Sequence, residues 1–110
     1  MESFVRGDIV VVEFPFNNVL GSKRRPALVL ADWNGIDVLL CQITSKVGRD
    51  IYSIAVTSQD FADGFLAYTS HIRVNQVFTL ERVLVSRRVG TLKREVTQGI
   101  VERLLKLLTK

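Results

Sequence analysis

The chain has 110 residues and a formal net charge of +4, from 15 Lys and Arg residues against 11 Asp and Glu residues. Hydrophobic residues make up 47% and charged residues 24%, which excludes a disordered chain. No apolar run reaches the ~20 residues of a membrane span, and the start lacks the layout of a secretory signal. We therefore expect residues 1–110 to form a single cytoplasmic domain with no membrane contact.

The positive charge lies in the second half of the chain. Residues 1–55 contain six basic and six acidic residues, whereas residues 56–110 contain nine and five. Such a surplus favours anionic partners, nucleic acids included, and makes their binding sensitive to salt.

Most of the chain is expected to form short strands. β-branched and apolar runs predict strands at residues 9–14, 27–31, 36–45, 52–56, 70–75 and 83–89. Asn34-Gly35 predicts a tight hairpin turn, because a type I′ turn requires two residues that tolerate positive φ. Residues 61–65 are expected to form a compact turn.

After Gly90 the apolar spacing becomes that of a helix. Val96, Ile100, Leu104 and Leu108 recur at every fourth position. The pattern predicts an amphipathic helix of about 15 residues with Thr91 as its N-cap. Six short strands and one terminal helix indicate a mainly β fold, a small antiparallel barrel with a C-terminal α-helix.

Several catalytic designs are missing from the sequence. It contains no phosphate-binding loop, dinucleotide-binding, serine-hydrolase or zinc-protease motif. One Cys and one His are too few for a zinc site, and the acidic residues lack the spacing of a magnesium nuclease. We expect no metal and no cofactor. Cys41 lies in an apolar run and is expected to be a small buried hydrophobe.

The first feature that favours an anionic ligand is the segment Gly21-Ser22-Lys23-Arg24-Arg25-Pro26. Three cations in a predicted loop precede a strand, and Pro26 biases the backbone of Arg25 toward extended geometry. A restrained guanidinium is well placed to bind a phosphate through its planar fork of donors. A solvated basic loop is the alternative.

The second feature is the register of the predicted hairpin. Pairing about Asn34-Gly35 opposes residues whose numbers add up to about 69, so Thr44 faces Arg25. The strand at 70–75 places His71, Arg73 and Asn75 on one side, as a binding surface or as a solvated face.

Six short segments occur in a recognisable order over about 85 residues. They are Gly7-Asp8-Ile9-Val10, Arg25-Pro26-Ala27-Leu28-Val29-Leu30, Gln42-Ile43-Thr44-Ser45, Arg73-Val74-Asn75-Gln76, Phe78-Thr79-Leu80 and Val89-Gly90-Thr91-Leu92. In this order they resemble the MazF/PemK family of bacterial toxins, which are ribosome-independent endoribonucleases of type II toxin–antitoxin systems.

The resemblance implies an SH3-like antiparallel β-barrel that forms a homodimer and binds single-stranded RNA in a groove at the dimer interface. It implies that Arg25 and Thr44 are catalytic in a metal-independent, sequence-specific endoribonuclease. The 2′-hydroxyl attacks the adjacent phosphorus and leaves a 2′,3′-cyclic phosphate and a 5′-hydroxyl. A cognate antitoxin is implied as the inhibitor whose extended segment occupies the groove, and operator DNA as a partner only through the antitoxin complex.

Within this framework Arg25 stabilises the charge on the phosphorane oxygens and Thr44 positions the scissile phosphate. The expected RNA-binding residues are Ser22, Lys23, Arg24, Ser45, Arg73, Asn75 and Gln76. Phe16 or Tyr68 is expected to stack on an unpaired base.

Two departures from the family pattern affect these roles. Many members carry Glu-Gln where Gly21-Ser22 is here followed by Lys23-Arg24. One branch carries Arg-x-Asp where this chain has Arg73-Val74-Asn75, and Asn cannot exchange a proton at neutral pH. His71 is the candidate acid–base residue in its place.

Two other functions are compatible with the same resemblance. Gyrase-poisoning toxins share the barrel but act by binding a protein, and a non-catalytic nucleic-acid-binding module would use the basic residues alone. The presence of both Arg25 and Thr44 favours cleavage, because a module that only binds does not need the pair.

Overall fold

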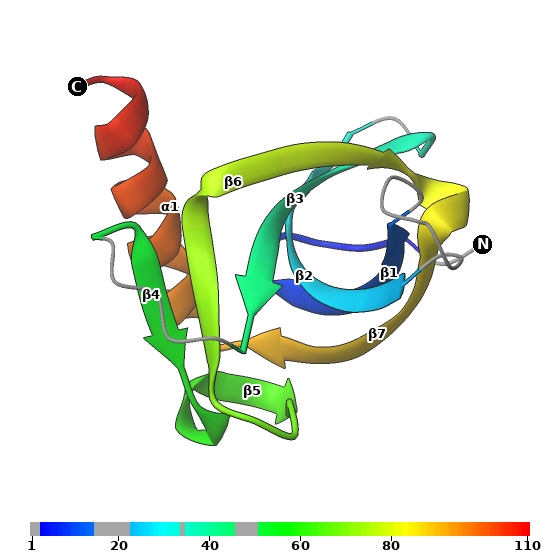
Figure 1. Cartoon of the computed structure of the whole chain (residues 1–110), viewed down its shortest axis with the longest axis horizontal. Helices are drawn as coiled ribbons and strands as arrows, with labels where there is room; N and C mark the ends of the chain where they lie inside the picture. Colours follow the sequence, from blue (N-terminus) through cyan, green and yellow to red (C-terminus); the bar gives the residue numbers. More distant parts are fainter. Residues whose placement is uncertain (1–2, 15–22, 34, 46–50) are drawn as a thin grey trace.

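A computed structural model of the chain describes residues 3–14, 23–33, 35–45 and 51–110. These residues form seven strands, two short 3-10 turns and one helix (Figure 1). In chain order the elements are β1 (Asp8–Phe14), β2 (Lys23–Asp32), β3 (Asp37–Thr44), β4 (Ser53–Val56), η1 (Ser58–Asp60), β5 (Phe61–Gly64), β6 (Ser70–Glu81), η2 (Arg82–Leu84), β7 (Val85–Leu92) and α1 (Arg94–Leu108).

The strands form one antiparallel sheet in the order β4-β6-β3-β2-β1-β7-β5. The sheet is strongly bent (Figure 1), but its ladder does not join β4 to β5, so it is not a closed barrel. The predicted fold class, mainly β and antiparallel with a C-terminal helix, is confirmed. Closure of the barrel is the part that differs, because the four-residue strands β4 and β5 each pair with one neighbour only.

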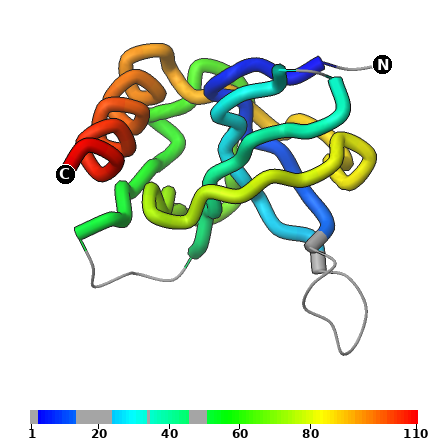
Figure 2. Tube along the Cα trace, turned by 90° about the horizontal axis from the view of Figure 1, so that it is seen from above, coloured from blue at the N-terminus to red at the C-terminus, as the bar shows by residue number. Residues whose placement is uncertain are grey.

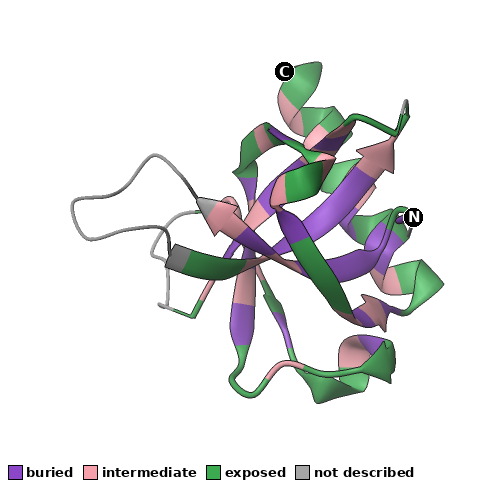
Figure 3. Ribbon diagram, turned by 90° about the vertical axis from the view of Figure 1, so that its right-hand side faces the viewer, coloured by how far each residue is buried: buried purple, intermediate pink, exposed green. Residues whose placement is uncertain are grey.

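Buried side chains project from both faces of the central strands β1, β2 and β3. Figure 3 shows long buried segments running through the sheet. One face contributes Ile9, Leu28 and Ile43 to an apolar cluster that also includes Ile100 of α1. The other face contributes to a second cluster that contains Val10, Val12, Ala27, Val29, Val38 and Leu40. Two separate cores therefore hold these three strands in place.

The predicted register of the β2–β3 hairpin is confirmed for the residue pairs that lie away from the turn. Leu28 lies opposite Cys41 and Val29 opposite Leu40, which is the predicted pairing. A bulge then shifts the pairing by one residue near the turn. Asn34 lies outside the described residues, and Gly35 has a φ of 75°, which suits the turn.

Two expectations about segments outside the predicted strands were wrong. The basic segment is not a loop before a strand, since β2 already begins at Lys23 and its ladder opposes Arg25 to Val12 of β1. Residues 61–65 are not a compact turn, because Phe61–Gly64 form β5 by pairing with the end of β7. Both segments are extended through pairing with residues distant in sequence, which local pattern does not reveal.

Thr91 is not the N-cap of the helix. It lies in β7, and its hydroxyl donates a hydrogen bond to Oδ1 of Asp8 at 2.9 Å. The helix begins at Arg94 after Lys93, and its 15 residues match the predicted length. Figure 2 shows α1 at the opposite end of the molecule from the N-terminus.

Cys41 is buried with 1% of its surface exposed, as expected. Burial raises the pKa of its thiol to about 12, and Sγ donates to the carbonyl oxygen of Arg73 at 2.9 Å. Because only the thiolate is strongly nucleophilic, we expect no reaction of the folded protein with a thiol-specific dye at pH 8. One equivalent should react once guanidinium unfolds the chain. Rapid labelling of the native protein would contradict this expectation.

Candidate functional site

The predicted pair, Arg25 and Thr44, lies on neighbouring strands. The β2–β3 ladder opposes Ala27 to Gln42, and continuing that register by two residues opposes Arg25 to Thr44. Residues directly opposite each other in an antiparallel pair share a face, with Cβ atoms about 4.5–5.5 Å apart. The guanidinium and the hydroxyl therefore start from adjacent positions on the same face of the sheet.

Strand β6 extends this row. Its ladder with β3 opposes His71 to Thr44 and Arg73 to Gln42. On its other side, β4 opposes Ser53 to Arg73. We use the term polar face for the six residues that these registers bring together: Arg25, Gln42, Thr44, Ser53, His71 and Arg73.

The polar face is accessible and carries positive charge. Arg25 is exposed, and the other five residues are half-buried. The intervening residues Ile43 and Ile72 point to the opposite face, where both are buried in the apolar cluster. The six residues include two guanidinium groups and no carboxylate, and no carboxylate among the described residues pairs with Arg25. Such a surface attracts phosphate groups.

A cleft with a volume of about 350 Å³ adjoins the polar face. Its lining consists of apolar, hydroxyl and cationic residues from β1, β2, β3, β7 and the segment before β6. They are Val11, Arg24, Arg25, Pro26, Ile43, Thr44, Ser45, Phe65, Leu66, Ala67, Tyr68, Ser70 and Val89. Arg25 and Thr44 line this cleft and also belong to the polar face, whereas Pro26 and Ile43, which alternate with them along the strands, belong to the cleft alone.

Two aromatic side chains are exposed at this cleft. Tyr68, a predicted stacking residue, is 77% exposed, and Phe65 is 67% exposed. Exposed rings beside cationic groups are typical of surfaces that stack unpaired bases. The sequence reading missed Phe65, because the residue follows a strand that was expected to be a turn.

The other residues that the sequence predicts to bind RNA are only partly described by the structure. Arg24 and Ser45 line the cleft, and Nε of Arg24 lies 3.8 Å from Oε1 of Glu13 on an exposed part of the surface. Lys23 is the first residue of β2, and its side chain is not described. Ser22 and Phe16 lie outside the described residues.

Asn75 and Gln76 are not part of the polar face. The β3–β6 register jumps from Gln42 opposite Arg73 to Cys41 opposite Val77, so residues 74–76 form an irregular segment between the two pairs. Asn75 instead lines a groove beside α1, together with Val77 and Leu108. Alternation along β6 predicts the shared face of His71 and Arg73 correctly, but it does not hold for Asn75, which follows the break in the register.

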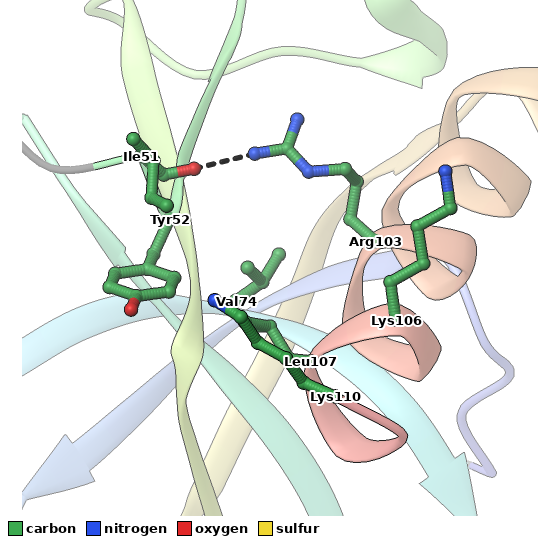
Figure 4. Close-up of a pocket in the computed structure, with 7 residues that line it drawn as sticks. All are labelled: Ile51, Tyr52, Val74, Arg103, Lys106, Leu107 and Lys110. Atoms are coloured by element: carbon green, nitrogen blue, oxygen red, sulfur yellow. Dashed lines mark hydrogen bonds between the residues drawn. The ribbon is translucent and has the colours of Figure 1, made fainter.

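The surface between α1 and strands β4 and β6 holds a further pocket of about 290 Å³ (Figure 4). Its walls include Tyr52, Val74 and Leu107, and the guanidinium of Arg103 donates to the carbonyl oxygen of Ile51 at 2.6 Å. This pocket is apolar with cations at its rim and shares no lining residue with the cleft.

Neither a metal site nor a membrane-spanning helix is found among the described residues. No group of three or more His, Cys, Asp and Glu side chains in this part of the chain is arranged to hold a metal ion. Among the same residues, no helix has the length and apolar character needed to cross a membrane.

Comparison with known families assigns the chain. The model of the PemK-like, MazF-like toxins of type II toxin–antitoxin systems matches residues 5–108. The protein therefore belongs to this toxin family. No curated protein sequence matches the chain significantly.

Solved structures with the same fold include several toxins. An endoribonuclease in complex with its cognate antitoxin from a mycobacterial species has a TM-score of 0.75 at 15% identity, covering 97% of this chain and 96% of that chain. The MazE–MazF complex of Deinococcus radiodurans has a TM-score of 0.74 at 20% identity, covering 94% of both chains. The Mycobacterium tuberculosis toxin MazF-mt6 has a TM-score of 0.73 at 18% identity, covering 93% and 96%.

Proposed function

We propose that this toxin is an endoribonuclease that cleaves single-stranded RNA on the polar face, without a metal ion. The observation that supports it best is the row formed by Arg25, Thr44 and His71 on three neighbouring strands. This row combines a fixed cation, a hydroxyl and a titratable imidazole within about 10 Å, the width of two strand spacings.

The reaction needs only groups that RNA and the chain supply. The 2′-oxygen of one nucleotide forms a bond to the adjacent phosphorus, and the bond from phosphorus to the 5′-oxygen of the next nucleotide breaks. The proton leaves the 2′-hydroxyl, and a proton is delivered to the departing 5′-oxygen. The products are a 2′,3′-cyclic phosphate and a 5′-hydroxyl.

Arg25 has the main electrostatic role in this proposal. Charge grows on the non-bridging oxygens of the phosphorane, and a preorganised guanidinium directed at them stabilises the transition state more than the ground state. Arg25 is exposed and free of carboxylates among the described residues, so its donors are available to the phosphate. Thr44, opposite it, holds the same phosphate through its hydroxyl.

His71 is the proposed proton carrier, because it lies opposite Thr44 on β6. Imidazole is the side chain most often used as a general acid or base. We expect His71→Gln to lower kcat for RNA cleavage by about 10²-fold or more, because proton transfer is then left to water. The measurement is steady-state kcat, with circular dichroism as the control for folding. An unchanged rate would remove His71 from the mechanism.

Residues around the polar face supply RNA affinity in this proposal. Arg24 and Arg73 contact phosphates beside the scissile one, and Ser45 adds a hydroxyl at the cleft. Tyr68 and Phe65 stack on bases that leave the strand, which their exposure supports. Gln42 and Ser53 are added to the predicted set, since their side chains belong to the same face.

We infer two protein partners for this chain. A cognate antitoxin competes with RNA for the cationic polar face, which an acidic extended segment would complement. A second copy of the chain completes a homodimer, and the exposed apolar residues Leu105 and Leu108 of α1 are consistent with a protein contact. Operator DNA is contacted through the antitoxin complex.

The direct test uses purified protein, EDTA and a single-stranded RNA of mixed sequence. We expect cleavage products with 2′,3′-cyclic phosphate and 5′-hydroxyl ends, identified by mass spectrometry. The same sequence with 2′-O-methyl groups throughout is the matched control, and it should bind without being cut, because the nucleophile is blocked. Cleavage of the methylated strand, or ends of the opposite polarity, would refute the mechanism.

A further inference from the structure

The edge strand β4 forms one border of the polar face. It pairs with β6 alone, and their register opposes Ser53 to Arg73 and Ala55 to His71. Ser53 and Arg73 both belong to the polar face, so the position of β4 decides where the hydroxyl of Ser53 lies beside the Arg73 side chain. A four-residue strand with one neighbour makes few ladder bonds, so contacts outside the sheet help to hold it in place.

The two ends of β4 are held by different contacts. Val56, its last residue, is 1% exposed and belongs to the apolar cluster that includes Ile100 of α1. Ile51, two residues before the strand, is 71% exposed. Tyr52 packs against the cluster only in part and also lines the pocket of about 290 Å³ beside α1. Apolar burial therefore fixes the end of β4 more firmly than its start.

Two hydrogen bonds hold the start of β4. In the first, Nη2 of Arg103 donates to the carbonyl oxygen of Ile51 at 2.6 Å, and Figure 4 shows the guanidinium reaching from α1 toward the strand. In the second, the N–H of Val74 donates to the carbonyl oxygen of Tyr52 at 3.1 Å. Val74 directly follows Arg73, at the break in the β3–β6 register, so Tyr52 supplies a backbone partner where the ladder with β3 is interrupted.

The contact made by Arg103 has a firm base and no competing anion. The neighbouring residues Leu104 and Leu107 pack against the apolar cluster, which fixes this turn of α1. In the described part of the chain no carboxylate pairs with Arg103. A hydrogen bond from a charged guanidinium is stronger than one from a neutral donor. The helix therefore tethers the start of β4 through this one side chain.

We propose that Arg103 is a positioning residue of the polar face. Its bond to Ile51 fixes the backbone that leads into β4, and this sets the place of Ser53 beside Arg73. The inference rests on the proposed function, in which the polar face binds RNA, and Arg103 itself does not touch RNA. Its effect falls on RNA affinity and not on the chemical step, because Arg25 and Thr44 lie on β2 and β3, away from β4.

The test compares Arg103→Ala with Lys106→Ala. Lys106 carries the same charge on the same helix and lines the same pocket, but it makes no hydrogen bond or ion pair with the described residues. We expect Arg103→Ala to raise KM for cleavage, and Kd for 2′-O-methyl RNA, by about three- to tenfold, because a charge-assisted hydrogen bond is lost. The value of kcat should stay within about twofold, and Lys106→Ala should change KM and Kd by less than about twofold.

Amide hydrogen exchange of the free protein tests the positioning step without RNA. The N–H of Val74 should exchange faster in Arg103→Ala than in wild type, because its acceptor on Tyr52 is less firmly held. Lys106→Ala should leave that exchange rate unchanged. An unchanged rate in Arg103→Ala would show that the tether does not hold the start of β4, and would overturn the proposal.

A combined variant separates positioning from simple loss of charge. In protein that already carries Ser53→Ala and Arg73→Ala, adding Arg103→Ala should not weaken RNA binding further, since the groups that it positions are absent. Full additivity there, or equal Kd values for Arg103→Ala and Lys106→Ala, would contradict the positioning role. If wild type neither binds nor cleaves RNA while Arg103→Ala alone speeds the exchange at Val74, the proposed function fails and the tether between α1 and β4 stands.

Discussion

Replacing Arg25 with alanine is expected to lower kcat for RNA cleavage by about 10²–10³-fold with a smaller change in KM. The guanidinium is proposed to act on charge that exists only in the transition state, so its loss falls on kcat. The fold should not change, because Arg25 is exposed and has no ion pair among the described residues. The measurement is steady-state cleavage of a fluorogenic single-stranded RNA in EDTA, with thermal unfolding monitored in parallel.

Arg24→Ala is the matched control for this experiment. Arg24 is adjacent in sequence and carries the same charge, but it alternates to the other face of β2 and lies near Glu13. It should mainly raise KM and lower the salt dependence of binding by about one counterion, while kcat remains within a few-fold. Equal activity of Arg25→Ala and wild type would exclude Arg25. If wild type and Arg25→Ala both show only background cleavage, the proposal that the protein is an endoribonuclease is rejected. Inhibition of gyrase supercoiling would then favour the gyrase-poisoning alternative.

Asp32→Ala is expected to reduce the free energy of unfolding by about 3–5 kcal/mol. Asp32 forms an ion pair with Arg82, and their side chains are only 3% and 10% exposed. Asp32 also accepts from the backbone N–H of Phe4 at 3.1 Å, and Arg82 stacks over the Phe4 ring at 5.5 Å. Removal of the carboxylate takes a buried ion-pair partner away from the Arg82 guanidinium and an acceptor away from the N–H of Phe4. Chemical denaturation with guanidinium measures the change.

Asp63→Ala is the matched control for the buried pair. Asp63 pairs with Arg88 at 3.1 Å, but the two side chains are 68% and 39% exposed. Screening by water limits the expected loss to about 1 kcal/mol or less. Adding Arg82→Met to Asp32→Ala should recover part of the stability, because the buried guanidinium is then replaced by an apolar side chain. Equal losses for Asp32→Ala and Asp63→Ala would show that burial does not strengthen the first pair.

Alternation and turn chemistry were enough to predict the register in the middle of the β2–β3 hairpin. Asn34-Gly35 fixed the hairpin, and a bulge near the turn did not disturb the pairing of Leu28 with Cys41. The same reasoning placed His71 and Arg73 on one side of β6. Only the β3–β6 ladder, which joins residues about 30 positions apart, reveals that His71 lies opposite Thr44.

The errors have a common physical origin. Phe61–Gly64 is a strand because β7 offers it backbone partners, and Lys23 begins β2 because β1 does the same. Likewise, the irregular stretch at residues 74–76 diverts Asn75 from the polar face to the groove beside α1. Each depends on long-range pairing, whereas the helix, whose apolar spacing is local, was predicted at the right length.

The double burial of β2 and β3 has a consequence for how this surface would operate. Apolar side chains pack against both faces of these strands, so the backbone of Arg25 and Thr44 already has its position in the absence of a ligand. Ligand binding then needs little free energy to order the backbone at these two residues. The spacing of these two side chains would then stay the same whichever ligand binds.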